Sequence, residues 1–204
     1  MNKDNNCFKP SKIKGFMILS DTHIKEAIKN GSVIIQPFDS EGLQPASYDL
    51  HLDNEFKIFK AHQTEVIDPS KPVANLMEQI KINEGDYFVL HPRSFALALV
   101  KEITGVDTKH VGRLEGKSSL ARLGLVIHTT SGFLDPGNSL KLTLELFNAS
   151  PIPIKLFPGM KIAQIAFEQL TGECERPYGS PGLNSKYYKS ESIDESKMYL
   201  NFKK

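Results

Sequence analysis

Short apolar runs separated by turn residues cover most of the chain, and only one stretch has helical spacing. In residues 17–31, Ile24, Ala27 and Ile28 form an apolar stripe, with Ser20 as a helix N-cap and Gly31 as the stop. The later runs are typical of β-strands: VIIQPF, YDLHL, FKIF, YFVL, FALALV, LGLVIHTT, SLKLTLELF, PIKLF and KIAQIAFEQL. With Pro and Gly at the joints, as in a turn at Pro158-Gly159, they predict a mainly β barrel or sandwich.

Strict alternation in residues 139–147 gives that strand two different faces. Its even positions are all leucine, from Leu140 to Leu146, so one face belongs to the core. Glu145 then points away from the core, beside Thr143. A single glutamate in such a place is most often a solvated residue, so this position becomes a candidate acid or base only together with other groups.

Other polar groups lie just before this strand. Lys117 to Arg122 offers an ammonium, two hydroxyls and a guanidinium, which suit an anion but also suit a short helix capped by Ser118 or Ser119. Asp135-Pro136-Gly137 reads as a turn that carries a carboxylate. His128 is expected to be a hydrogen-bonded sheet histidine, and Asp49 a residue that caps a turn.

Composition narrows the class of protein. Lys plus Arg number 25 against 24 for Asp plus Glu, and the net charge of +1 gives no field to gather nucleic acid or an anionic membrane. The leader lacks an apolar segment, and the longest apolar run, residues 95–100, is too short to span a bilayer. The two cysteines lie far apart, at Cys7 and Cys174, so a disulfide framework is not expected. We expect a cytoplasmic protein.

The chain divides into three parts by composition. Residues 1–16 are polar and basic and are predicted to be an N-terminal extension. Residues 17–174 contain the apolar runs and are predicted to form one β domain. Residues 175–204 contain few apolar side chains, which predicts a mobile tail or a lid that orders on a ligand.

Several strings together resemble the dCTP deaminase family, which is similar in fold to the trimeric dUTPases. They are PASYDLHL, GKSSLARLGLVIHTTSGFLDPG with LTLELFN, and PGMKIAQIAF with RPYGS and SKY, and the likeness runs from Met17 to about Tyr188. The resemblance implies a homotrimer of distorted β-barrel or jelly-roll subunits with a short N-terminal helix. It also implies sites at subunit interfaces and a flexible C-terminal lid over the nucleotide.

The resemblance assigns roles to residues. Glu145 would be the general base that activates water against C4 of cytosine, with Ser118 and Arg122 positioning the reactants, and Asp135 would meet the sugar 3′-hydroxyl. The nucleotide-binding positions are Lys117, Ser118, Ser119, Leu120, Ala121, Arg122, Asp135, Thr143, Leu144, Glu145, Gln164, Tyr178 and Lys186. Mg²⁺ is implied on the triphosphate, held by phosphates and water more than by direct protein ligation. Zinc is not expected, because zinc deaminases need a pair of nearby cysteines.

The product depends on the turn before the long strand. Members that form dUMP resemble Thr-Ala-Gly-Phe-Ile-Asp, and this chain has Gly132-Phe133 within Thr130 to Asp135, which favours dCTP conversion to dUMP, ammonia and diphosphate. Alternatives are a deaminase that releases dUTP, a dUTPase without deaminase activity, and a non-catalytic nucleotide-binding trimer or interaction module. Whether dTTP acts as an inhibitor stays open.

Three positions depart from the family pattern, and one distance needs explanation. Ser131 replaces an alanine, Asn138 replaces an aromatic residue near the deoxyribose, and Ser190 replaces a glutamine of the lid. Ten residues separate Asp135 from Glu145, which is up to ~34 Å if extended. Contact of both with one nucleotide therefore requires a turn and a β-bulge between them.

Overall fold

A computed structural model describes residues 17–60 and 66–202. The predicted extension, residues 1–16, lies outside the described residues. The helices are α1 (Asp21–Asn30) and α2 (Ser118–Ala121), with short 3₁₀ turns at Ser40–Gly42, Ala74–Leu76 and Met198–Phe202. The strands are β1 (Met17–Ile18), β2 (Val33–Gln36), β3 (Leu43–Gln44), β4 (Ser47–Phe59), β5 (Met77–Lys81), β6 (Phe88–Leu90), β7 (Phe95–Val106), β8 (His110–Gly116), β9 (Leu125–Val126), β10 (Phe133–Leu134), β11 (Ser139–Asn148), β12 (Ile154–Leu156) and β13 (Lys161–Gln169).

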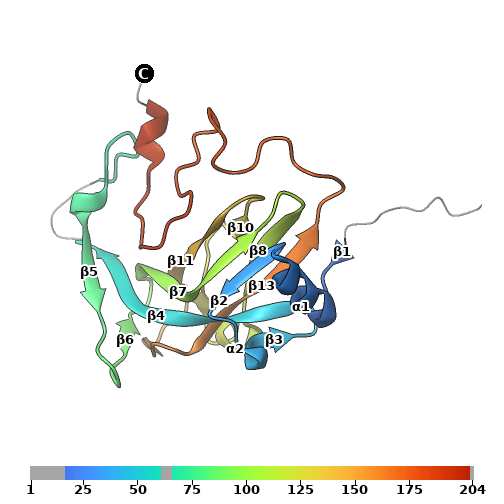
Figure 1. Cartoon of the computed structure of the whole chain (residues 1–204). Helices are drawn as coiled ribbons and strands as arrows, with labels where there is room; N and C mark the ends of the chain where they lie inside the picture. Colours follow the sequence, from blue (N-terminus) through green and yellow to red (C-terminus); the bar gives the residue numbers. More distant parts are fainter. Residues whose placement is uncertain (1–16, 61–65, 203–204) are drawn as a thin grey trace, which may run out of the picture.

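The strands form a curled antiparallel sheet, which confirms the predicted mainly β fold class (Figure 1). Its main path runs β10-β8-β13-β4-β7-β11-β9, and β12 pairs separately with β6. β4 connects the two halves, because its first part pairs with β13 and its second part pairs with β5 and β7. The leucines, isoleucines and phenylalanines of the inner faces fill the space between these halves.

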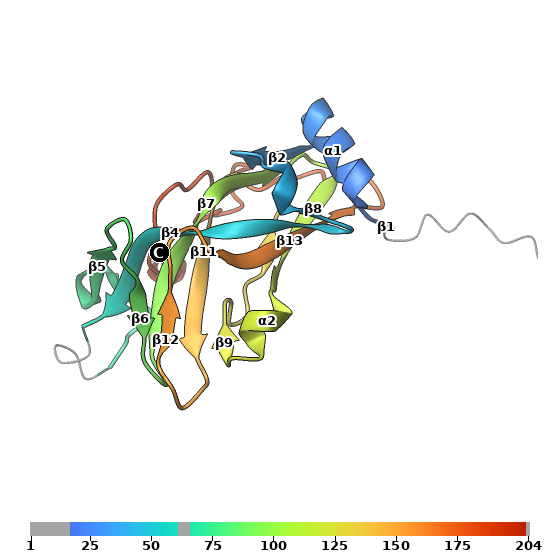
Figure 2. The same cartoon turned by 90° about the horizontal axis from the view of Figure 1, so that it is seen from below.

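Helix α1 covers one edge of the sheet beside β2 (Figure 2). Ile24 and Ala27 are buried, as the apolar spacing predicts. Ser20 is the N-cap, but its hydroxyl contacts the side chains of Thr22 and His23 instead of a backbone N–H. Gly31 ends the helix at φ 81°, a conformation that glycine adopts without steric cost.

The predicted strand pattern is confirmed for most runs and wrong for one. YDLHL and FKIF join into the single strand β4, whereas in LGLVIHTT only β9 is strand and residues 127–130 leave the sheet. Strand β8 was not predicted, because glycines at both ends of its RLE core weaken the alternation. Gly112 is needed there, since a Cβ would lie 2.9 Å from the Ile165 side chain.

Strand β11 has the two faces that its alternation predicts. Leu142, Leu144 and Leu146 are buried, while Thr143 and Glu145 are partly exposed. The register with β7 shifts between Lys141 and Thr143, which is the predicted bulge.

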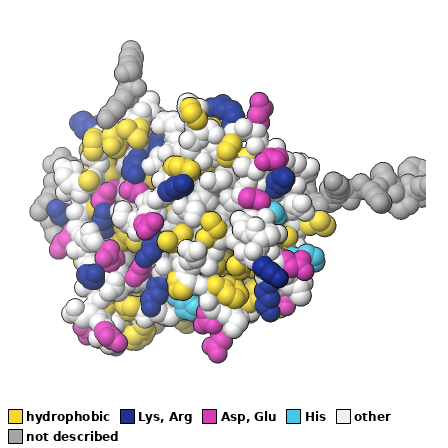
Figure 3. Space-filling view, viewed as in Figure 1, with side chains coloured by type: hydrophobic (Ala, Val, Ile, Leu, Met, Phe, Trp, Pro, Cys, Tyr) yellow, Lys and Arg dark blue, Asp and Glu magenta, His cyan; other side chains and the backbone are white. Residues whose placement is uncertain are grey.

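The face of the molecule seen in Figure 3 carries charges of both signs in a mixed distribution. Lys and Arg alternate with Asp and Glu, and apolar side chains lie between them in small groups. This agrees with the balanced composition, 25 basic against 24 acidic residues. Among the described residues, no helix has the length and apolar character needed to cross a membrane.

Replacement of Leu144 tests the division of β11 into two faces. Leu144→Ala removes a fully buried side chain, so it should lower the free energy of unfolding by about 2–5 kcal/mol. Thr143→Ala on the opposite face should cost less than about 1 kcal/mol. Urea unfolding at one fixed protein concentration measures both. Equal losses for the two variants would contradict the assignment of the faces.

Candidate functional site

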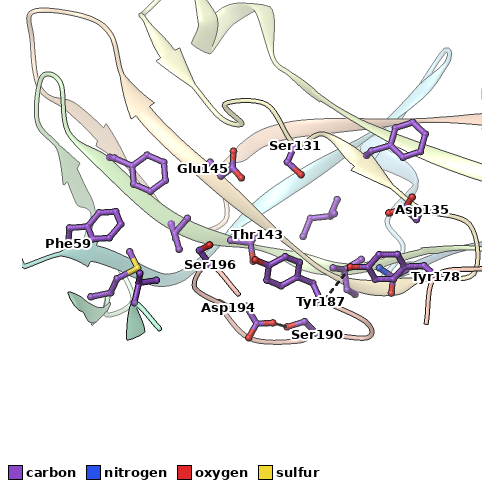
Figure 4. A pocket seen from close by; sticks show the side chains of 18 residues that line it. Phe59, Ser131, Asp135, Thr143, Glu145, Tyr178, Tyr187, Ser190, Asp194 and Ser196 are labelled. Atoms are coloured by element: carbon purple, nitrogen blue, oxygen red, sulfur yellow. Dashed lines mark hydrogen bonds between the residues drawn. The ribbon is translucent and has the colours of Figure 1, made fainter. Parts of the chain in front are cut away.

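A cavity of about 520 Å³ lies between the outer face of β11, the segment after residue 130 and the C-terminal tail (Figure 4). Its polar lining comes from side chains far apart in sequence. They are Ser131, Asp135, Asn138, Thr143, Glu145, Tyr178, Tyr187, Ser190, Asp194 and Ser196. Phe59, Phe95 and Leu97 are among the apolar residues that line the same cavity. The volume is in the range of small-molecule sites.

Glu145 enters the cavity from β11, where it lies opposite Leu97 of β7. One carboxylate oxygen accepts the backbone N–H of Thr129 at 3.0 Å. No hydrogen bond within the described residues engages the second oxygen. The side chain is therefore held in place and still has an oxygen that can accept a proton from a bound water.

Asp135 lines the same cavity from the predicted turn. The turn forms as expected: Gly137 has φ 80°, and the Asn138 N–H donates to the Asp135 carbonyl at 3.2 Å. Burial disfavours the charged carboxylate and raises the pKa of Asp135 above its ordinary value. The turn and the bulge of β11 bring Asp135 and Glu145 to one cavity, as the sequence required.

The C-terminal tail closes one side of the cavity and is attached to the turn. The Tyr178 N–H donates to the Pro136 carbonyl at 2.8 Å, and Asn138 Oδ1 accepts the Lys189 N–H at 3.2 Å. Ser190 also has partners: its carbonyl accepts the Lys141 N–H, and its hydroxyl donates to Asp194 at 2.6 Å. Tyr187, Asp194 and Ser196 were not predicted as site residues, because nothing local in the sequence shows where the tail lies.

A second polar group lies around α2, outside the cavity. Lys117, which is the N-cap of α2, reaches Asp49 of β4. Gln164 of β13 donates to the Gly116 carbonyl at 3.2 Å and accepts the Ser47 hydroxyl at 3.0 Å. The predicted short helix is confirmed, but the serine cap is wrong, because no side chain caps α2. The predicted cap role of Asp49 is also wrong, since its buried carboxylate binds lysines instead.

The structure therefore divides the predicted site residues between two places. Asp135, Thr143, Glu145, Tyr178 and Phe133 line the cavity. No residue of the stretch 117–122 lines it, nor does Gln164, and Figure 1 shows α2 at the edge of the molecule opposite the tail. The Leu144 side chain is in the core, and Lys186 lies in the tail, where its carbonyl accepts the Lys197 ammonium at 3.1 Å.

Comparison with known proteins identifies the family of this chain. A family profile described as dCTP deaminase-like matches residues 18–170. The chain belongs to the dCTP deaminase-like family. The protein named "dCTP deaminase, dUMP-forming" from Corynebacterium jeikeium is 45% identical over 186 residues, covering 91% of this chain and 99% of that protein. Its namesake from Streptomyces coelicolor is also 45% identical over 186 residues, covering 91% of this chain and 97% of that protein.

The fold agrees with this family. The crystal structure of 2′-deoxycytidine 5′-triphosphate deaminase from Agrobacterium tumefaciens superposes with a TM-score of 0.60 at 19% identity. The superposition covers 76% of this chain and 48% of that chain. The resemblance identified from the sequence strings is confirmed.

Within this member of the dCTP deaminase-like family, the turn before β10 packs closely against β8. A Cβ on Gly132 would lie 2.8 Å from the Leu114 carbonyl oxygen. The Gly132 carbonyl in turn accepts the Leu114 N–H at 2.7 Å. His128 lies beside this turn, since its ring is 3.4–3.5 Å from that Cβ position. Its buried Nδ1 has no partner among the described residues, so the predicted hydrogen-bonded sheet histidine is wrong.

Replacement of Asp135 tests the effect of burial on its carboxylate. Because the folded pKa is raised, the folded state binds the proton more tightly, and ionisation costs stability as pH rises past the ordinary value of 3.8. Asp135→Asn should therefore raise the thermal midpoint of nucleotide-free protein near neutral pH. This advantage should shrink as pH falls toward 3.8. Thermal melts across a pH series measure it.

Asp107→Asn is the control, and it should behave in the opposite way. Burial opposes ionisation of Asp107, but hydrogen bonds from His110 and the Lys109 N–H outweigh it and lower the pKa of that carboxyl. Its stabilising contribution is present above the ordinary pKa and is lost as pH falls. A lower midpoint at neutral pH for both variants would contradict the assignment for Asp135.

Proposed function

We propose that the protein converts dCTP and two waters to dUMP, ammonia and diphosphate. The observation that carries this proposal is that Glu145 and Asp135 line one cavity of nucleotide size. It is supported by relatives that are 45% identical over nearly their whole length and are named for this reaction. The enzyme acts on free nucleotides, and we place it in the cytoplasm.

Glu145 is the general base for deamination. Its free oxygen takes a proton from the water that attacks C4 of cytosine, and the same carboxyl then passes a proton to the departing amino group. The Thr129 N–H keeps the carboxylate in place throughout. Thr143, two residues earlier on the same face of β11, lines the cavity beside it and is available to bind the base.

Asp135 acts at the other end of the nucleoside. Its carboxylate accepts the sugar 3′-hydroxyl and orients a second water toward the α-phosphorus. A raised pKa makes such a carboxylate a better proton acceptor than an ordinary aspartate. Tyr178, which is attached to the same turn through Pro136, contacts the nucleotide from the tail.

The second polar group completes the site in a homotrimer. Ser118, Ser119, Ala121 and Arg122 are exposed, and the neighbouring apolar side chains of Leu123 and Val126 are exposed as well. Such a surface is typical of an interface with another copy of the chain. Lys117, Ser119 and Gln164 of one subunit then bind the triphosphate of a nucleotide whose base lies in the cavity of the next. Ser118 and Arg122 of the same stretch position the attacking water and the base. The tail, with Lys186, closes over it as a lid.

Magnesium enters with the triphosphate. Among the described residues, no three His, Cys, Asp or Glu side chains gather in a metal-binding group. The ion would be held by phosphates and waters more than by direct protein ligation. When bound, Mg²⁺ neutralises charge on the departing diphosphate.

The turn at Gly132-Phe133 supports dUMP as the product. Phe133, which is 57% exposed, lines the cavity close to Asp135 in the chain, and Gly132 lets the turn that carries Phe133 pack directly against β8. The glycine thereby fixes the turn next to the carboxylate that orients the second water.

The products formed from dCTP test the proposal directly. Purified protein with dCTP and Mg²⁺ should release ammonia, dUMP and diphosphate in equal amounts, without free dUTP as an intermediate. Ion-exchange chromatography with a diphosphate assay measures all of them. Accumulation of dUTP without diphosphate would mean a deaminase that stops at dUTP. Hydrolysis of dUTP with dCTP unchanged would mean a dUTPase.

Glu145→Gln tests the role of the base. Loss of a general base should lower the rate of ammonia release by about 10²- to 10⁴-fold. The amide still accepts the Thr129 N–H, so dCTP affinity, measured by calorimetry, should change little. Glu55→Gln, at a side chain that accepts from Gln79 of the neighbouring strand β5 and lies outside the cavity, is the control and should be fully active. An unchanged rate for the Glu145 variant would refute the role.

A further inference from the structure

A buried carboxylate outside the cavity contacts two lysine side chains. Asp49 of β4 is 2% exposed. Its Oδ1 contacts the Lys117 ammonium, and its Oδ2 contacts the Lys161 ammonium at 3.2 Å and accepts Gln44 Nε2 at 3.2 Å. The single negative charge of Asp49 is therefore shared by two ammonium groups, and the three side chains together have a net charge of +1.

The surplus charge faces solvent through Lys161. The Lys117 side chain is 22% exposed and the Lys161 side chain 41% exposed. The Lys161 ammonium also donates to the Glu41 carbonyl at 3.0 Å, which gives it two fixed partners. An ammonium with two partners and open access can donate its third hydrogen to an anion.

A β-bulge aims Lys161 at this place. In a regular strand, residues 161 and 164 would face opposite sides. The register of β13 with β4 shifts between Lys161 and Ala163, so both Lys161 and Gln164 lie beside Asp49. Gln164 donates to the Gly116 carbonyl, directly before Lys117, so β13 contacts both the backbone next to Lys117 and the carboxylate that pairs with its ammonium.

We propose that Lys161 is a further polyphosphate-binding residue, held beside Lys117 by their shared counter-ion, Asp49. The proposal rests on the proposed function for the placement of the triphosphate at Lys117. A bound polyphosphate offsets the surplus charge that Asp49 leaves, so its affinity depends on both ammonium groups. Asp49 is a positioning residue, which acts through the two lysines.

Inorganic triphosphate is the probe, because its binding does not depend on deamination. Lys161→Met should weaken its binding by about 5- to 20-fold in calorimetric titrations, with a weaker dependence on salt concentration. Lys161→Arg keeps the charge and should bind within about 3-fold of the parent protein. Lys155→Met removes a lysine of β12 whose ammonium lies over the Tyr87 ring, and this change should leave the affinity for triphosphate unchanged. Parent-like affinity in Lys161→Met would overturn the proposal.

Kinetics with dCTP separate binding from a general loss of structure. Lys161→Met should raise KM for dCTP by about the same 5- to 20-fold and leave kcat within about 2-fold. A fall in kcat with unchanged KM would overturn the proposal. If the parent protein does not deaminate dCTP, the proposed function fails, and the triphosphate titration still decides the role of Lys161.

Asp49→Asn tests the shared counter-ion, with Glu102→Gln as its matched control. Glu102 of β7 is similarly buried and pairs with His51 of β4, but among the described residues it contacts no lysine. Both variants should lower the thermal midpoint. Only Asp49→Asn should show a smaller increase of that midpoint on adding triphosphate than the parent protein, because the two ammonium groups then lose the carboxylate that holds them side by side. Equal increases in Asp49→Asn and Glu102→Gln would overturn the role of Asp49.

Discussion

The pairing of β11 with β7 is the constraint on which the cavity depends. It places Leu142, Leu144 and Leu146 in the core, and the same alternation forces Glu145 to the open face. The bulge after Lys141 then shortens the path from the Asp135 turn. A slip of one residue in this register would bury Glu145 and expose the leucines, so stability and chemistry select the same register.

The turn at residues 135–138 connects this strand to the tail. Pro136, Asn138 and Lys141 each provide a backbone or side-chain partner to the tail, at Tyr178, Lys189 and Ser190. Ile193 is anchored further on in a small apolar cluster with Met77, Leu97 and Leu99. Movement of the tail therefore involves the element that carries Asp135. If a nucleotide binds at Asp135 as proposed, these contacts couple its binding to the position of the tail.

The sequence predicted those parts of the structure that depend on local pattern. Alternation identified the face of Glu145, and Pro and Gly identified the turns, because both effects act over a few residues. It could not place Asp194 in the cavity, nor Asp49 beside two lysines, because those contacts join segments far apart in the chain. His128 was misjudged for the same reason: its surroundings come from β8 and the turn, after its own segment has left the sheet.

Gly132 fixes the position of the turn before β10 by its close packing against β8. The Leu114 carbonyl lies where its Cβ would be, so β8 excludes a side chain there even without a ligand. A relative with a larger residue at this position must shift the turn away from β8, and Phe133 and Asp135 would move with it. In the proposed reaction, the contribution of the turn is therefore its packing against β8, which fixes where Phe133 and Asp135 lie.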